Sequence, residues 1–187
     1  MKIDRPSFMI TGASASGKTT LGNMALNNGW RCASVHLTRP KRPDEIEGVH
    51  GVFLTEEQFV ANFAQGAYIE TSLQDTLLQP IGYYYGTPKS MLYDLRQDGV
   101  CAIPTCVKMA RKVFEIIDEV VWVHLICSDV DRRARLVARN ITGDEIEARM
   151  TMGESSDSPP GDATIYSTSD LSADDILRDI RANCVSA

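Results

Sequence analysis

Eight residues near the amino terminus form a loop whose composition suits the binding of phosphate groups. Residues 12–19 read GASASGKT and match G-x-x-x-x-G-K-[ST] at every fixed position. Glycines let such a loop wrap until its backbone N–H groups point at phosphate oxygens. Lys18 can then reach the β- and γ-phosphates, and Thr19 can offer its hydroxyl to Mg²⁺. We expect a phosphate site made of Gly12, Ala13, Ser14, Ala15, Ser16, Gly17, Lys18, Thr19 and Thr20.

A second group of residues could hold a phosphorylated acceptor. Arg39 and Arg42 lie three positions apart in an acidic protein, and guanidinium groups suit bidentate capture of a phosphate monoester. Tyr85 and Thr87 can donate hydroxyls to the same phosphate. Glu70, when ionised, accepts hydrogen bonds only and could read an N–H edge of a base. Each also has an ordinary interpretation, as part of a solvated basic loop or as a surface charge.

Arginines gather again in the second half of the chain. On a helix that starts near Asp129, Arg132, Arg135 and Arg139 fall on one side because their spacing is three and four. A solvated helix face has this pattern. So does a lid whose arginines clamp a transferring phosphoryl group, for which charge neutralisation matters more than a base. We assign the lid role to Arg135 and Arg149 before Arg132 and Arg133.

Short apolar runs alternate with helical patterns and would carry these groups. The expected strands are 7–11, 33–37, 100–103, 120–126 and 163–166. The expected helices are 18–28, one that begins with a capping box at Thr55, 88–97, 108–117, 129–139 capped by Asp129, 144–152 capped by Asp144, and 172–182. Strands that alternate with helices imply right-handed crossovers and a mostly parallel sheet, hence an α/β fold.

The middle of the chain breaks this rhythm. Residues 38–87 contain prolines, turns and short runs, and we interpret them as an inserted acceptor-binding lobe with its own small β structure. The core would then comprise residues 1–37 and 88–187, with a lid at about 129–160. Residues 153–161, GESSDSPPG, read as a loop within that lid.

Four segments in this order resemble the guanylate kinase family. They are the loop at 12–20, the stretch from Thr38 to Gly48 followed by Phe53, the segment 68–70, and the turn YYGT at 84–87. Arg135-Leu136 with Arg139, and then Arg149, is similar to the family's lid. DATIYSTSDL, at 162–171, occupies the place of its adenine-side strand and turn. The resemblance covers nearly the whole chain and implies a P-loop three-layer sandwich with an inserted monophosphate lobe and a lid.

The resemblance also implies an activity and residue roles. The function would be ATP-dependent phosphorylation of GMP or dGMP, with Mg²⁺ as cofactor. The same fold also serves kinases for other acceptors, such as ribose 1,5-bisphosphate or another deoxynucleotide, and a non-catalytic binding module is a further alternative. The catalytic residues would be Lys18, Arg42, Arg135 and Arg149. Arg139 would join the phosphate loop in binding ATP, and Thr19 would bind the metal. The acceptor would be held by Arg39, Arg42, Glu70, Tyr85 and Thr87.

Three segments depart from the family pattern. Gly51 stands where the family has an aromatic hydroxyl, and residues 71–81 are longer than the usual connection. Residues 103–107, IPTCV, replace an acidic D-x-D run whose carboxylates assist Mg²⁺ and read the guanine amino group. Losing such an interaction costs a few kcal/mol, so guanine specificity is less secure than phosphoryl transfer.

Composition bounds the remaining possibilities. The chain has 187 residues, 43% hydrophobic, and a net charge of −6, which argues against a generic nucleic-acid or membrane-surface binder. Five cysteines without a CxxC pair indicate free thiols in a reducing compartment, and three histidines lack metal-ligand spacing. No stretch approaches the roughly 20 apolar residues that cross a bilayer. We expect a cytoplasmic monomer or homodimer whose partners are small nucleotides.

Overall fold

The central element of the fold is a parallel sheet. The computed structural model describes residues 5–42, 45–72, 82–104, 106–117, 119–151, 161 and 163–183. Within them, five strands pair in parallel in the order β2-β7-β1-β8-β9. Their bounds are β1 Phe8–Gly12, β2 Arg31–Ala33, β7 Val100–Ala102, β8 Val121–Ile126 and β9 Thr164–Ser167. The predicted mostly parallel sheet is confirmed.

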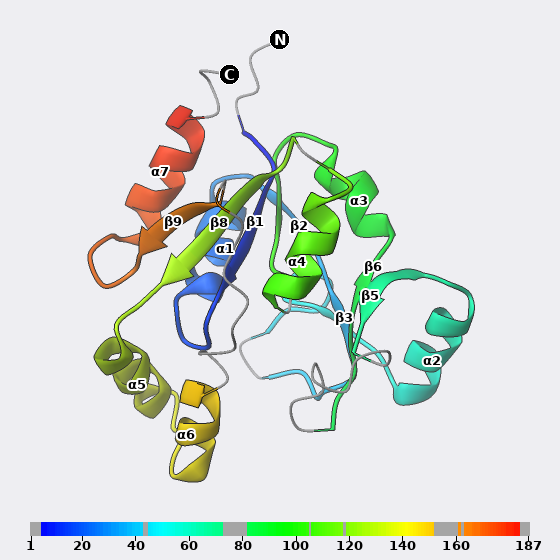
Figure 1. Cartoon of the computed structure of the whole chain (residues 1–187), viewed down its shortest axis with the longest axis horizontal. Helices are drawn as coiled ribbons and strands as arrows, with labels where there is room; N and C mark the ends of the chain where they lie inside the picture. Colours follow the sequence, from blue (N-terminus) through cyan, green and yellow to red (C-terminus); the bar gives the residue numbers. More distant parts are fainter. Residues whose placement is uncertain are drawn as a thin grey trace.

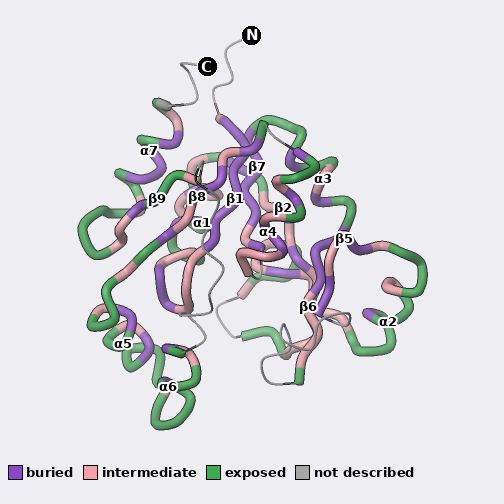
Figure 2. Tube along the Cα trace, in the orientation of Figure 1, coloured by how far each residue is buried: buried purple, intermediate pink, exposed green. Residues whose placement is uncertain are grey.

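Helices cover both faces of this sheet (Figure 1). One face packs against α1 (Lys18–Asn27) and α7 (Ala173–Asn183), through side chains such as Leu21 and Ile176. The other packs against α3 (Ser90–Leu95) and α4 (Val107–Phe114), through side chains such as Met91. Figure 2 shows the buried residues concentrated between these layers. The three-layer sandwich is therefore present as predicted.

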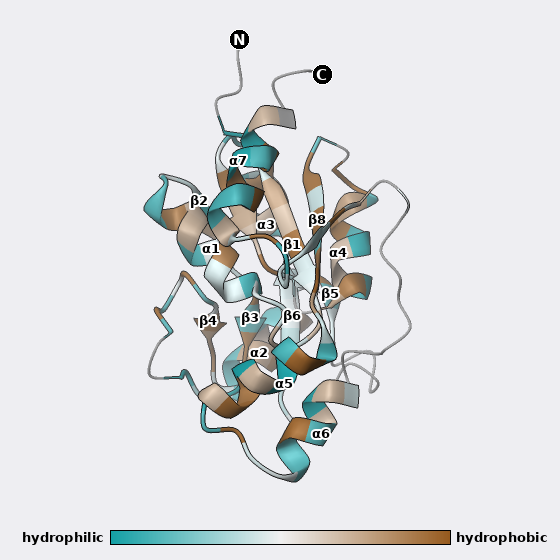
Figure 3. Cartoon of the chain, turned by 90° about the vertical axis from the view of Figure 1, so that its left-hand side faces the viewer, coloured by the Kyte–Doolittle hydropathy of each residue, from teal (hydrophilic) through white to brown (hydrophobic). Residues whose placement is uncertain are grey.

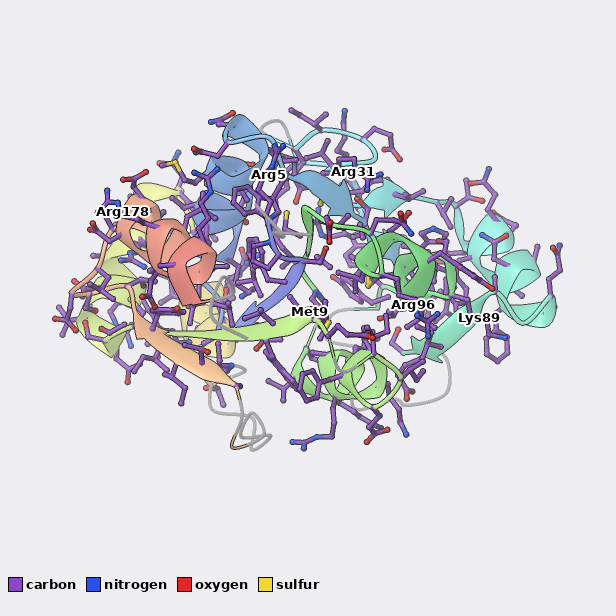
Figure 4. The ribbon with its side chains drawn as sticks, turned by 90° about the horizontal axis from the view of Figure 1, so that it is seen from above. Arg5, Met9, Arg31, Lys89, Arg96 and Arg178 are labelled. Atoms are coloured by element: carbon purple, nitrogen blue, oxygen red, sulfur yellow. The ribbon has the colours of Figure 1, made fainter. Side chains whose placement is uncertain are left out.

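Side chains on the inner and outer surfaces differ as this layering requires. Met9 on β1 is fully buried, whereas Arg178 on α7 points outward and pairs with Asp174 and Asp175 (Figure 4). In Figure 3, hydrophilic residues colour the side of α7 that faces the viewer. Within the described residues, none of the helices has the length and apolar character that crossing a membrane requires.

A second sheet lies beside the first. Its strand order is β4-β3-β6-β5, with bounds β3 His36–Leu37, β4 Val52–Phe53, β5 Tyr68–Thr71 and β6 Tyr85–Pro88. Helix α2 (Glu56–Ala64) covers one face, where the Phe59 ring stacks on Tyr68 and Tyr84. The predicted capping box of α2 is confirmed, with Thr55 and Gln58 bonded reciprocally. The second sheet includes residues 36, 37 and 88, just outside the predicted lobe; the division into core and lobe stays a prediction.

Helices α5 (Asp129–Ala138) and α6 (Asp144–Thr151) follow β8 and pack on each other. Figure 1 shows them on one side of the phosphate loop, with the second sheet and α2 on the other side. The N-cap of α5 is Ser128, not Asp129 as predicted, because the Ser128 Oγ accepts the backbone N–H of Asp131. A serine before the first helical residue competes well for this position. Residues 152–160, most of the predicted lid loop, lie outside the described residues.

Two further predictions of element bounds are wrong. The run 33–37 is not one strand: the first sheet keeps β2 as far as Ala33, and β3 belongs to the second sheet. The apolar alternation continues where the chain passes from the first sheet to the second. The hydrophobic pattern therefore does not show where the chain changes sheet. The helix expected from residue 88 starts at Ser90, because Pro88 still belongs to β6.

Candidate active site

The phosphate loop joins β1 to α1, and glycines determine its path. Gly12 has a φ of +142°, and a Cβ there would lie 2.3 Å from the backbone oxygen of Leu125. Gly17 has a φ of +103° and precedes the first turn of α1. Only glycine adopts the Gly12 conformation in this space without strain. The loop therefore passes directly against the carboxyl end of β8 and leads into the N-terminus of α1.

Lys18 begins α1 and folds back over the loop. Its Nζ donates hydrogen bonds to the backbone oxygens of Gly12 and Ala13, both at 2.7 Å. Burial, with the positive charges of Arg139 and Arg132, lowers the Lys18 pKa to about 8. A bound phosphate would oppose these effects because an anion favours the charged ammonium. Thr19 and Thr20, next in the first turn, are exposed.

A cavity of about 290 Å³ opens beside the loop, between α1, α5 and α7. Arg135 forms one wall, where its guanidinium donates to the backbone oxygens of Ala15 at 3.2 Å and Thr168 at 2.8 Å. Arg139 also lines the cavity and is exposed. The cavity has the size of a small-ligand pocket. Its lining residues are Ala15, Gly17, Thr20, Leu21, Arg135, Arg139, Thr168, Leu171, Ser172, Ala173 and Ile176.

Thr168 is a site residue that the sequence analysis did not single out. Its Oγ1 donates to the backbone oxygen of Ser16 at 2.8 Å and accepts from Arg135 at 3.0 Å. It thus ties the turn after β9 to the phosphate loop. Ser16 itself is fully buried, and its Oγ lacks a hydrogen-bond partner. The only sequence signal for Thr168 was its place within DATIYSTSDL.

Arg39, on the second sheet's side, forms an ion pair. Its Nη1 donates to Glu45 Oε2 at 2.7 Å, and its guanidinium lies 5.4 Å from the centre of the Phe53 ring. Although burial opposes its charge, the Glu45 carboxylate raises the pKa of Arg39. Burial also acts against the charge of Glu45, but hydrogen bonds from Arg39 and the Arg42 backbone lower the Glu45 pKa. The sequence analysis assigned no role to this carboxylate, which belongs to the Thr38–Gly48 stretch.

Three arginines and a phenol converge from different elements. Burial and the positive charges of Arg39 and Arg149 lower the pKa of Arg42, against the pull of Glu45. Burial raises the pKa of Tyr85, although Arg39, Arg42 and Arg149 act in the opposite direction. Arg149 belongs to α6, whereas Tyr85 begins β6. The excess of positive charge between these elements suits a phosphate monoester, which Arg forks bind bidentately.

Glu70 and Thr87 stand opposite each other across β5 and β6. Alternation along β6 puts Thr87 on the same face as Tyr85. Thr87 is fully buried, and its Oγ1 is without a hydrogen-bond partner; Glu70 is half-buried. Buried hydroxyls nearly always have a hydrogen-bond partner. A hydroxyl without one, beside a carboxylate, therefore indicates a place where a polar group of a ligand could bind.

The structure also bears on two of the sequence departures. A Cβ at Gly51 would lie 2.7 Å from Leu37 Cδ2, so a larger residue at this position requires the buried Leu37 side chain to move. His50 bonds to the Ile46 backbone and, at 2.8 Å, to Asn23 of α1. Residues 73–81 and Thr105 lie outside the described residues. Among the described residues, no group of three or more His, Cys, Asp or Glu gathers as metal ligands.

Arg149 completes the set of predicted site residues. Its Nε and Nη2 donate to Glu145 Oε1 of the same helix, at 3.0 and 2.7 Å. Arg132, which the sequence analysis placed after Arg135 and Arg149 as a lid residue, is buried. It donates a hydrogen bond to the phosphate loop at the backbone oxygen of Ser14. The structure thus brings Arg39, Arg42, Arg149 and Tyr85 together, and separately groups Arg135, Arg139 and the loop around the cavity.

Comparison with known proteins identifies the family. The family model described as guanylate kinase matches residues 4–112, which is more than half of the chain. The chain belongs to the guanylate kinase family. A guanylate kinase of Symbiobacterium thermophilum is 32% identical over 146 residues, covering 76% of this chain and 66% of the relative. One of Neisseria meningitidis serogroup A is 34% identical, covering 76% and 68%. The matched segments thus span about two thirds of these guanylate kinases.

Solved structures agree in fold. A guanylate kinase from Anaplasma phagocytophilum has a TM-score of 0.64 at 21% identity, covering 98% of this chain and 88% of that one. A gluconokinase from Sinorhizobium meliloti 1021 has a TM-score of 0.55 at 13% identity, covering 98% and 93%. At these identities the structures show a shared P-loop kinase fold. The family and the fold together support a nucleoside monophosphate kinase.

Proposed function

We propose that this chain transfers the γ-phosphoryl group of ATP to GMP or dGMP, producing ADP and GDP or dGDP. The observation that carries this proposal is that Arg39 and Arg42 share the Glu45 carboxylate, while their charges and that of Arg149 act together on Tyr85. The same chain has a phosphate loop and belongs to the guanylate kinase family. One site accommodates a donor's phosphates and the other an acceptor's phosphate monoester. Phosphoryl transfer needs these two groups positioned and neutralised, with little covalent chemistry from the protein.

On the donor side, the loop and Lys18 would hold the phosphates of ATP, and the cavity beside Arg135 and Arg139 would receive its base and ribose. When phosphates arrive, the Lys18 ammonium would exchange two loop carbonyls for phosphate oxygens. The exposed Thr19 hydroxyl in the first turn of α1 fits Mg²⁺, which usually keeps several waters and takes the rest of its ligands from substrate phosphates. When bound, Mg²⁺ would neutralise negative charge on the donor phosphates.

On the acceptor side, Arg39 and Arg42 would hold the phosphate with the Tyr85 hydroxyl. Glu45 neutralises part of their charge and fixes Arg39 before the substrate binds. Arg149 reaches the same region from α6. It would therefore contact the transferring group from a different element of the fold, and its charge would matter most in the transition state. Arg42 and Arg149 are accordingly the proposed catalytic arginines of this half-site.

Base recognition would fall to Glu70 and Thr87. The Glu70 carboxylate can accept from the N1–H and N2–H of guanine, and the Thr87 hydroxyl can serve a further polar atom of the base. Adenine and cytosine present no comparable pair of donors on that edge. The sequence 103–107 contributes no carboxylate, so discrimination rests on fewer groups than the family pattern contains.

An acceptor panel tests the proposal. ADP release with Mg-ATP is measured against GMP, dGMP, AMP, CMP, dTMP and ribose 1,5-bisphosphate, with Lys18→Met as the blank. We expect turnover with GMP or dGMP, absent in the blank. Turnover only with another acceptor would retain the kinase and reject guanine as its substrate. Retained ATP binding without turnover of any acceptor would reject the proposal in favour of a binding module.

A further inference from the structure

Arg132 is buried, whereas Arg133, the next residue on α5, is exposed. Its relative exposure is 5%, and its side chain points under the phosphate loop. The guanidinium donates from Nε to the Ser14 backbone oxygen at 3.1 Å and from Nη1 to Asp129 Oδ1 at 2.9 Å. Nη2 donates to the backbone oxygens of Arg149 at 3.3 Å and Met150 at 3.2 Å. One planar group thus joins three separate parts of the chain.

Two of these partners lie at the carboxyl end of α6. The last four carbonyls of a helix lack partners within the helix, and a cation there is favourable. Arg132 donates hydrogen bonds to the backbone oxygens of Arg149 and Met150 and places a positive charge at this end of the helix. The third partner, Ser14, lies in the phosphate loop. Arg132 is therefore a direct polar connection between the loop and the end of α6.

Apolar packing accompanies this connection. Ala15 of the loop, Leu136 of α5, and Ile146 and Met150 of α6 form a small buried cluster. The loop, α5 and α6 therefore meet in a dry contact beside Arg132, and a guanidinium fork suits it because several fixed carbonyls must be reached at once. A lysine, with one compact ammonium, cannot span Ser14 and both α6 carbonyls in the same way.

Arg133, the next residue, offers a matched contrast. It also links α5 to α6, through Glu147 at 2.5 and 3.2 Å, but both side chains are about half exposed or more. Exposed ion pairs contribute little because solvent screens them. Among its described contacts, Arg133 has none with the phosphate loop. The two arginines therefore share helix, charge and partner helix, and differ in burial and in contact with the loop.

We propose that Arg132 is a positioning residue that fixes the end of α6, and with it Arg149, to the phosphate loop. This inference rests on the proposed function for its kinetic consequence. The binding of donor phosphates in the loop is then coupled to the placement of Arg149 over the acceptor. A displacement of about 1 Å at such a group can cost on the order of 100-fold in rate.

Kinetics give the first test. We expect Arg132→Met and Arg132→Lys to lower kcat for GMP at least about 10-fold, because neither reproduces the fork. Arg133→Met should stay within about two-fold of wild type. Arg132→Lys keeps charge and bulk, so it reports even where the methionine variant fails to fold. In an Arg149→Met background, adding Arg132→Lys should cost less than about three-fold more, because contacting residues with one role are not additive.

A second measurement does not need an acceptor. We expect Mg-ADP to slow hydrogen exchange at the amides of α6 in wild type and in Arg133→Met, but not in Arg132→Lys. If wild type transfers no phosphoryl group to GMP, the proposed function fails, and this exchange measurement still decides on Arg132. The inference is overturned by equal α6 protection in wild type and Arg132→Lys. It is also overturned if Arg132→Lys keeps the wild-type kcat. It is overturned as well if the fold-losses in kcat of Arg132→Lys and Arg149→Met multiply in the variant that carries both.

Discussion

Thr87 buries a hydroxyl whose oxygen has no hydrogen-bond partner, on the face of β6 that also carries Tyr85. An unsatisfied buried polar group costs about 1–3 kcal/mol. Because the fold retains this cost, we interpret the hydroxyl as a ligand for the acceptor base. At residue scale, the site therefore contains a group that is useful to a bound substrate and unfavourable to the folded protein alone.

Replacing Thr87 separates these two effects. We expect Thr87→Val, which is nearly isosteric, to leave the free energy of unfolding unchanged or about 1 kcal/mol higher. The KM for GMP should rise about 10-fold, the equivalent of about 1.4 kcal/mol. Urea unfolding and steady-state kinetics measure the two. Thr71→Val, at a buried threonine opposite Gly86, is the control and should leave KM unchanged. A Thr87→Val protein markedly less stable than wild type would contradict this account.

Glu45 links the acceptor arginines to acid stability. Its pKa is lowered in the folded protein from 4.5, because hydrogen bonds from Arg39 and the Arg42 backbone outweigh burial. A depressed carboxyl pKa contributes stability that is present above pH 4.5 and is lost as pH falls through the lower folded value. We expect wild type to be more stable than Glu45→Gln at pH 7, with the difference shrinking below pH 4.5. Urea unfolding across this range measures it; a constant difference would contradict the ion pair.

At the scale of elements, the phosphate loop depends on its approach to β8. Gly12→Ala would place a Cβ 2.3 Å from the Leu125 backbone oxygen, at a φ of +142°. We expect the variant to lose at least about 2 kcal/mol of unfolding free energy and to lose ATP binding, as measured by thermal unfolding and titration calorimetry. Gly143→Ala is the control: its φ is +57° with no atom within 4 Å, so it should cost about 1 kcal/mol and keep ATP binding.

The elements also show where sequence reasoning succeeds. The loop and α1 were predictable because strand, glycine loop and helix all follow one another in residues 8–27, each with its own local signal. The split of the run 33–37 was not, because the buried alternation of Ala33, Val35 and Leu37 continues through it, and the change of sheet depends on distant pairing with β7 and β6. The cap of α5 was misassigned by one residue, since serine and aspartate are adjacent and both suit the position.

For the whole molecule, long-range contacts decide what the sequence leaves open. The residue spacing placed Arg132, Arg135 and Arg139 on one helical side, but burial of Arg132 follows from Ser14, 118 positions away. The proximity of Arg149 to Arg42, 107 positions earlier in the chain, likewise arises from folding. The resemblance to the family could point to these arginines as site residues. Only the fold indicates that the segment of Arg42 and the segment of Arg149 contribute to one site.

The central claim is that arginines from the second sheet's side and from α6 hold the acceptor phosphate. The most direct test is steady-state kinetics of Arg42→Met beside Lys41→Met, an exposed neighbour that removes the same charge. We expect Arg42→Met to lower kcat/KM for GMP at least about 10-fold, equivalent to about 1.4 kcal/mol, with the KM for ATP unchanged. Lys41→Met should resemble wild type. Equal behaviour of the two variants, or a loss confined to the KM for ATP, would contradict the account.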